Sequence, residues 1–256
     1  MSDPEPRLVD LLDASRRIML FTGAGISTGS GIEDYRGPSG QWKTRDPVYF
    51  QDFMSREEAR VEYWDQKLET WPMIRDAQPN ATHRAVVDLE HMGSVAMVVT
   101  QNIDGLHEKA GTSPERLVEL HGTNLKIECM SCHETNDPEP LFQVFSSTRR
   151  PPVCDACGGY LKPATISFGQ SLKEEALRRS MAAAMATDLV VALGSSLSVH
   201  PAASIPLVAA QRGVPYVVIN RGVTDHDAFD VVTLRLDGDV SELFPPAVEA
   251  CLGADA

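Results

Sequence analysis

Five short apolar segments run along the chain, and each is continuous rather than alternating between polar and apolar positions. They cover Ile18–Thr22, Val95–Thr100, Leu189–Leu193, Tyr216–Ile219 and Val231–Leu236. Strands have this composition when helices cover both faces of their sheet. We therefore predict a mostly parallel sheet that is buried on both sides.

Amphipathic helical patterns accompany these segments. Arg7–Ser15 and Asn80–Glu90 carry apolar residues at helical spacing. After the segment at 189–193, Pro201 suits the first turn of a helix and Gly213 suits its exit. Strand, helix and strand in that order form a βαβ unit. The pattern predicts an α/β fold with an open, doubly wound sheet, in which ligands bind beyond the carboxyl ends of the strands.

Two stretches interrupt this alternation. Residues 31–77 run from a Gly- and Pro-rich loop into a polar helical pattern, and residues 125–162 hold most of the cysteines, with little periodicity. We interpret both as insertions that together make a smaller inserted domain. The sheet domain is then discontinuous in sequence and consists of residues 1–30, 78–124 and 163–256.

The charge and the N-terminus narrow the class of protein. A formal net charge of −13 repels phosphate backbones, so we expect no nucleic-acid partner. It suits a basic, lysine-containing partner, and solubility explains it equally well. The stretch MSDPEPRLVDLL has no basic flank leading into an apolar run, and no segment approaches the roughly 18 apolar residues of a spanning helix. We expect a cytoplasmic protein without membrane contact, and a monomer by default.

Four of the five cysteines form two C-x-x-C pairs. Cys129 with Cys132 and Cys154 with Cys157 give the spacing C-x2-C-x21-C-x2-C, which is close to known zinc patterns. Four thiolates leave no open coordination position, so the predicted Zn²⁺ is structural, one per chain. CMSCH also matches a haem-attachment motif, but that reading leaves the second pair unexplained.

Small and polar residues follow several of the predicted strands. FTGAGISTGSG begins at Phe21, GSSLSVHP begins at Gly194, and QNIDGLH begins at Gln101, while Asn220 ends a fourth strand. The glycine spacing differs from the usual dinucleotide fingerprint, and a tight turn would explain the first stretch alone. Four such ends together favour a long polar ligand such as a dinucleotide.

One histidine has the neighbours of a general base. His121 follows an apolar stretch and precedes Gly122, so one face of its ring would be accessible. A hydrogen-bonded core histidine is the plainer interpretation of these residues alone. Surface or helix roles suffice for His83, His91, His133, His200 and His226.

In order along the chain, these motifs resemble the sirtuins, NAD-dependent protein deacylases. GAGISTGSGIEDYRGPSGQW is similar to the family's GAGxS…GIPDFRGPxGLW, and TQNIDGLH matches TQNIDxLH without change. LHG, the paired cysteines, KPATISFGQ, GSSLSVHP, VIN and DGDV follow in the family's order. The resemblance spans residues 8–245 and implies a Rossmann-like NAD-binding domain, with a cofactor-covering loop and helical module at 31–77 and a zinc ribbon at 125–162.

The resemblance also implies roles for individual residues. His121 is the implied base, Asn102 and Arg36 are implied to assist it, and His107 is implied to be structural. The acyl-lysine carbonyl oxygen would attack the ribose, and His121 would then deprotonate a ribose hydroxyl. The implied cofactor contacts are Gly23, Ala24, Gly25, Ile26, Tyr35, Arg36, Gln101, Asn102, Ile103, Asp104, Gly194, Ser195, Ser196, Asn220 and Val240. An acyl-lysine peptide would lie as an added strand along Ile166, Phe168 and Gly169.

Departures from the family pattern bear on specificity. Gln170 stands where the family has glutamate, and Glu33, Tyr35 and Gln41 also differ. Members that remove acidic acyl groups carry a Tyr-x-x-Arg pair where this chain has WDQK, Trp64–Lys67. We predict a preference for neutral acyl groups. Protein mono-ADP-ribosyl transfer or NAD hydrolysis on the same scaffold is the alternative activity, and a non-catalytic NAD or ADP-ribose sensor is a third.

Overall fold

The computed structural model describes residues 4–33 and 46–254, and its larger sheet has six parallel strands. In chain order they are β1 (Ile18–Thr22), β2 (Val95–Thr100), β3 (Leu117–Glu119), β7 (Leu189–Leu193), β8 (Tyr216–Asn220) and β9 (Leu234–Asp237). Their spatial order is β3-β2-β1-β7-β8-β9. Numbered along the chain, this is the order 3-2-1-4-5-6 of dinucleotide-binding sheets, whose direction of winding reverses between β1 and β7. The predicted doubly wound α/β fold is confirmed.

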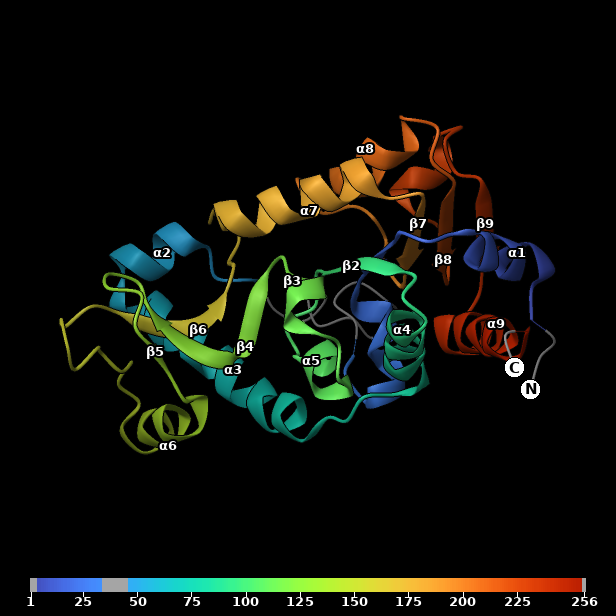
Figure 1. The fold of residues 1–256 in the computed structure, drawn as a ribbon. Helices are drawn as coiled ribbons and strands as arrows, with labels where there is room; N and C mark the ends of the chain where they lie inside the picture. The colour runs from blue at the N-terminus through green and yellow to red at the C-terminus, as the bar shows by residue number, and fades with distance from the viewer. Residues whose placement is uncertain (1–3, 34–45, 255–256) are drawn as a thin grey trace.

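Helices cover both faces of this sheet (Figure 1). One face packs on α1 (Pro6–Ala14), α4 (Ala81–His91) and α9 (Val240–Ala254), and the other packs on α7 (Glu174–Ala186) and α8 (Ser204–Ala210). Alternate residues of β1 serve the two cores, with Leu20 in the first and Phe21 in the second. Both are fully buried, which explains why the strand is apolar without alternation.

A second sheet lies beside the first, with strand order β5-β4-β6 and antiparallel pairing. It consists of β4 (Gly122–Cys129), β5 (Thr135–Asn136) and β6 (Leu161–Thr165), and it packs with α2 (Phe50–Ser55), α3 (Glu57–Asp76) and α6 (Pro138–Thr148). Trp64 is fully buried in this core, where its indole N–H donates to the carbonyl of Leu161 at 3.0 Å. Two insertions that are far apart in sequence therefore share one core.

The two sheets meet within three residues of chain. β3 ends at Glu119, and β4 begins at Gly122, so His121 occupies the junction. Gly122 has φ +72°, and a Cβ there would lie 2.0 Å from the carbonyl oxygen of Ala164. Only glycine tolerates both the left-handed backbone and this approach. The predicted domain boundaries after residues 124 and 162 fall inside β4 and β6.

Three of the five predicted strands have the observed bounds, while β8 extends one residue further, to Asn220, and β3 was not predicted. The last strand begins at Leu234 rather than Val231, because Val231 and Val232 pack as partly buried residues ahead of the ladder. Pro201 does not start a helix: α8 begins at Ser204, and residues 201–203 form a turn. The short helix α5 (Leu106–Ala110) follows the QNIDG segment. Among the described residues, no helix combines the length and apolar character needed to cross a bilayer.

Candidate active site and metal centre

Two glycine turns pack against each other where β1 and β7 end. The amide of Gly25 donates to the carbonyl of Gly194 at 2.8 Å, and a Cβ on Gly25 would lie 2.7 Å from the Cα of Gly194. Gly23 is similarly close to Ser195, with 2.8 Å between its hypothetical Cβ and that side chain. No side chain fits between the turns, so backbone amides line this point of the sheet edge, where ligands of such folds bind.

The chain beyond Gly23 forms short 3₁₀ turns rather than an α-helix. Ala24–Ile26 is one such turn, and Thr28–Ser30 is the next. Ile26 is buried against the sheet, whereas Ala24 and Gly25 are partly exposed. The amides near a phosphate would therefore come from tight turns and not from a helix end.

Gln101 connects the carboxyl ends of three neighbouring strands. Its backbone amide donates to the Thr22 carbonyl at 2.9 Å, and its side-chain amide donates to the Ser195 hydroxyl at 2.9 Å. Thr22 ends β1, and Ser195 follows β7, while Gln101 itself follows β2. The structure thus brings the first turn, the second turn and the QNID segment to one edge.

A buried polar network lies behind Gln101. The Asn102 amide donates to the Gly23 carbonyl at 3.1 Å and to the Ser27 hydroxyl at 3.2 Å. Ser27 in turn donates to the Asp104 carboxylate at 2.7 Å, and the Leu106 amide donates to the same carboxylate. Burial raises the pKa of Asp104, while these hydrogen bonds oppose the shift. Sequence reasoning did not identify Ser27, the residue that links Asn102 to Asp104.

The ring of His121 is fixed through one nitrogen. Its Nδ1 lies 3.0 Å from the carbonyl oxygen of Gln101. A carbonyl only accepts hydrogen bonds, so Nδ1 carries the proton in the neutral ring, and Nε2 has a free lone pair. Burial lowers the pKa of His121, and the bond to Gln101 opposes that shift. His121 as a whole residue is partly exposed.

The remaining predicted cofactor contacts surround the same edge, with two outside the described residues. The Gly194 amide donates to the Ile219 carbonyl, next to Asn220 at the end of β8. Ser196 follows the second turn, Val240 begins α9 and is buried, and the Ile103 carbonyl accepts from the Asn124 amide at 2.8 Å. The predictions for Tyr35 and Arg36 fall outside the described part of the chain.

The predicted peptide-binding segment adjoins His121. The Ile166 amide donates to the His121 carbonyl at 2.8 Å, so the segment starts beside the histidine. At its far end, the Phe168 carbonyl accepts from the Phe50 amide at 2.9 Å, and the Gly169 carbonyl accepts from the Gln51 side chain at 3.0 Å. The segment is therefore held between the histidine and the start of α2.

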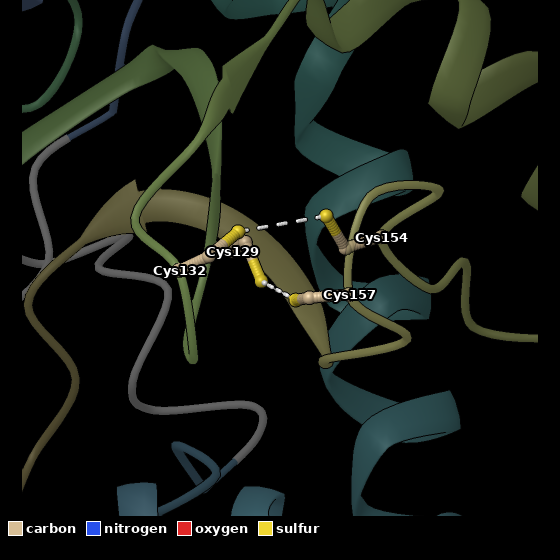
Figure 2. Close-up of side chains that lie close together, drawn as sticks. All are labelled: Cys129, Cys132, Cys154 and Cys157. Atoms are coloured by element: carbon tan, nitrogen blue, oxygen red, sulfur yellow. Dashed lines mark hydrogen bonds between the residues drawn. The ribbon is translucent and has the colours of Figure 1, made fainter.

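The four paired cysteines converge beside the small sheet, as Figure 2 shows. All four sulfurs lie within 4.8 Å of one another, with 3.6 Å between Cys129 and Cys157 and 3.7 Å between Cys132 and Cys154. A tetrahedron with Zn–S bonds of about 2.3 Å has edges of about 3.8 Å, which these distances approach. The donor set therefore fits a structural zinc ion.

A buried histidine pair behind the site was not predicted. His83 on α4 and His107 on α5 have ring centroids 5.1 Å apart, and His107 Nε2 lies 3.0 Å from the Thr22 hydroxyl. Burial lowers the pKa of His83 to about 4 and that of His107 to about 3. The surface or helix role expected for His83 is thus incomplete, because the side chain caps α4 and is buried. His226 is also buried, with Nδ1 2.8 Å from the Tyr216 hydroxyl.

The chain is similar to known proteins over most of its length. The profile of the Sir2 family matches residues 23–201. An NAD-dependent protein deacetylase from Rhodopseudomonas palustris is 38% identical over 248 residues, which covers 97% of each chain. NAD-dependent protein deacetylase 1 from Bradyrhizobium diazoefficiens is 39% identical over 242 residues, 94% of each chain. A Sir2 variant solved with a deacetylated p53 peptide and 3'-O-acetyl ADP ribose superposes with a TM-score of 0.84 at 34% identity, over 96% of this chain and 98% of that one.

Zinc content tests the metal centre. We expect one zinc per chain by elemental analysis, and we expect Cys132→Ser to lose most of it because three thiolates bind more weakly than four. Thermal stability should fall with the metal, since the small sheet loses its crosslink. Cys251→Ser is the matched control, because this cysteine lies on α9 and outside the cluster. Full zinc occupancy in the Cys132 variant would contradict the assignment.

The histidine pair predicts a loss of stability in acid. Both folded-state pKa values lie below the unfolded value of about 6.5, so protons bind the unfolded chain more readily. The stabilising contribution of the neutral pair is fully present above pH ~6.5. As pH falls below that value towards the folded-state pKa, each histidine lowers the free energy of unfolding by about 1.4 kcal/mol per pH unit. Urea unfolding at several pH values should show a shallower decline for His83→Gln than for the wild type. His91→Gln, exposed on the same helix, should keep the wild-type slope.

Proposed function

The chain belongs to the Sir2 family of NAD-dependent protein deacetylases, and we propose that it performs this reaction in the crevice beyond β1, β2 and β7, with His121 as general base. The balanced reaction converts NAD, an acyl-lysine side chain and water into nicotinamide, O-acyl-ADP-ribose and free lysine. The observation that carries the assignment is the hydrogen bond from His121 Nδ1 to the Gln101 carbonyl.

That hydrogen bond selects the tautomer that the chemistry needs. With its proton on Nδ1, the imidazole presents an unprotonated Nε2 that can accept a proton from a ribose hydroxyl. The lowered pKa of His121 keeps the ring neutral near pH 7. Because Gln101 also bonds Ser195 and Thr22, the base is aligned by the same residue that joins the cofactor turns.

The crevice supplies complementary groups for each part of NAD. Backbone amides of Ala24, Gly25 and Ile26 suit the phosphates, and the turn at Gly194 with Asn220 suits the adenosine half. Asn102 and Asp104 are buried, and in this proposal they hold the nicotinamide end, whose departure leaves the ribose open to attack. We propose that Tyr35 and Arg36 complete this end, as the resemblance implies, with Phe168 helping to exclude water.

The partner is an acyl-lysine protein or peptide. We propose that it pairs as an extended strand with the segment that holds Ile166, Phe168 and Gly169, beside His121. The structural zinc ion stabilises the small sheet that carries this segment's amino-terminal end. We propose that the chain is divided into a discontinuous NAD-binding domain, a helical module and a zinc module. We also propose a cytoplasmic location, because paired thiols stay reduced in that compartment.

The helical module favours neutral acyl groups. Trp64 is buried and hydrogen-bonded to Leu161, so its indole cannot act as an acyl-group receptor. Lys67 Nζ donates to the Asn124 side chain at 3.1 Å, and burial lowers the pKa of Lys67. A carboxylated acyl chain would meet neither a tyrosyl hydroxyl at position 64 nor a guanidinium fork at position 67.

Product identification tests the function. We expect the wild type, incubated with NAD and an acetyl-lysine peptide, to form O-acetyl-ADP-ribose and deacetylated peptide, both identified by mass spectrometry.

The activity should depend on pH and on His121. Activity should fall as pH decreases through a pKa below about 6.5, because the base becomes protonated. His121→Ala should lose at least about a hundredfold in turnover yet still bind NAD by calorimetry. ADP-ribosylated protein or free ADP-ribose as the main product would favour the alternative activity instead, and unchanged NAD would favour a sensor.

Acyl preference tests the helical module. On peptides of one sequence, we expect the acetyl group to be removed about tenfold faster than the succinyl group, because no charge-assisted fork offsets desolvation of the carboxylate. Initial rates from mass spectrometry at matched peptide concentrations provide the comparison. Faster removal of succinyl would contradict the prediction.

A further inference from the structure

Lys162, on β6, has a side chain that is fully buried. Lysine is almost never in this position unless its ammonium group is paired. Its Nζ faces three oxygens: the Pro163 carbonyl at 3.1 Å, the Thr165 carbonyl in a short contact, and the Gln170 side-chain oxygen at 3.5 Å. All three belong to the residues that lead into and close the predicted peptide-binding segment.

Gln170 carries this contact into the segment itself. Its side-chain oxygen also accepts from the Ser167 amide at 3.1 Å, and its own amide donates to the Ser167 carbonyl at 3.0 Å. The segment from Ile166 to Gly169 is thus closed into a turn whose two ends are held by one amine and one amide side chain. Gly169, with φ +78°, provides the left-handed residue that the turn requires.

Burial is the main reason why the pKa of Lys162 is lowered, and the charged neighbours act in both directions. Glu128 on β4 is the nearby carboxylate, but it already binds Lys173 at 2.8 Å and His133 at 3.1 Å. The Tyr63 ring on α3 lies 5.5 Å from Nζ, and Lys162 in turn helps to lower the pKa of Lys67 on the same helix. Burial lowers the pKa of Lys162 to about 7, against a smaller opposing effect of Glu128, and Lys173 lowers it further.

We propose that Lys162 is a positioning residue for the acyl-lysine peptide: its ammonium group holds residues 163–170 in the peptide-binding shape, and loss of its proton weakens peptide binding. An ammonium has three N–H donors for the three facing oxygens. The neutral amine has two, and its lone pair would oppose the third oxygen. Gln170, at the longest distance, is the partner expected to be released, and the turn at Ser167 would loosen with it.

A cavity adjoins the residues that surround the Lys162 amine. A cavity of about 450 Å³ is lined by Lys162, Gln170, Ile166, Lys173 and Phe50, among others. It lies behind the peptide-binding segment and next to the start of α7. The inference rests on the proposed function, because it concerns the peptide of that same reaction, and it adds a dependence of peptide affinity on pH.

The experiment measures binding of a fluorescent acetyl-lysine peptide by polarisation, without NAD so that no turnover occurs. For the wild type, we expect Kd to rise about tenfold between pH ~6 and pH ~9, which corresponds to the loss of one charge-assisted hydrogen bond. Gln170→Glu places a carboxylate beside the ammonium and raises the pKa of Lys162, so its Kd should change less than about twofold over that range. Gln211→Glu, an exposed change of equal charge at the end of α8, should behave as the wild type.

Each result decides the proposal. Parallel pH curves for wild type and Gln170→Glu would overturn it, as would a flat wild-type curve. Lys162→Met gives a second reading: its melting curve reports folding, and its Kd should be weak and independent of pH. Complete absence of peptide binding at every pH would overturn the proposed function itself, which distinguishes that failure from failure of the lysine's role.

Discussion

The site depends on one close backbone contact, in which Gly122 lies against the carbonyl of Ala164. There is no room for a Cβ at this contact. Because glycine has none, the chain can leave the parallel sheet after Glu119 and enter the antiparallel sheet three residues later. His121 is the last residue before the antiparallel sheet begins. Its ring bonds the cofactor edge through the Gln101 carbonyl, and its own carbonyl receives the Ile166 amide from the peptide-binding segment. A single residue thus aligns the two halves of the reaction.

The same region concentrates buried polar groups that would be costly elsewhere in a core. Asp104, His107 and Lys162 are each almost fully buried. Burial shifts the pKa of each so that the neutral form is favoured: upward for Asp104, downward for His107 and Lys162. A hydrogen bond from Ser27 offsets part of this cost at Asp104, and a hydrogen bond between Thr22 and His107 does so at His107. Groups whose charge is finely balanced by burial and hydrogen bonding are typical of functional sites. The network explains why Gln101 through His107, at the end of a buried strand, are so polar.

Features of the fold and the site could be predicted from the sequence where a local pattern of residues reports them. The strand Leu189–Leu193 was predicted with its observed bounds because burial on both faces makes the whole segment apolar. Residues at strand ends were predicted to converge because the topology of parallel sheets requires it. The pairing of His83 with His107 depends on how α4 and α5 pack, and no local pattern reports that. Lys162 would be assigned to the surface by its type, and only the three facing oxygens reveal its burial.

The most direct test is a crystal structure of the wild-type protein with an unreactive NAD analogue and an acetyl-lysine peptide. The account predicts that His121 Nε2 lies within hydrogen-bond distance of a hydroxyl on the nicotinamide ribose, with the acetyl oxygen facing the anomeric carbon. It would be contradicted by a ribose bound on the far side of the glycine turns, separated from the imidazole by the packed backbone of Gly25 and Gly194.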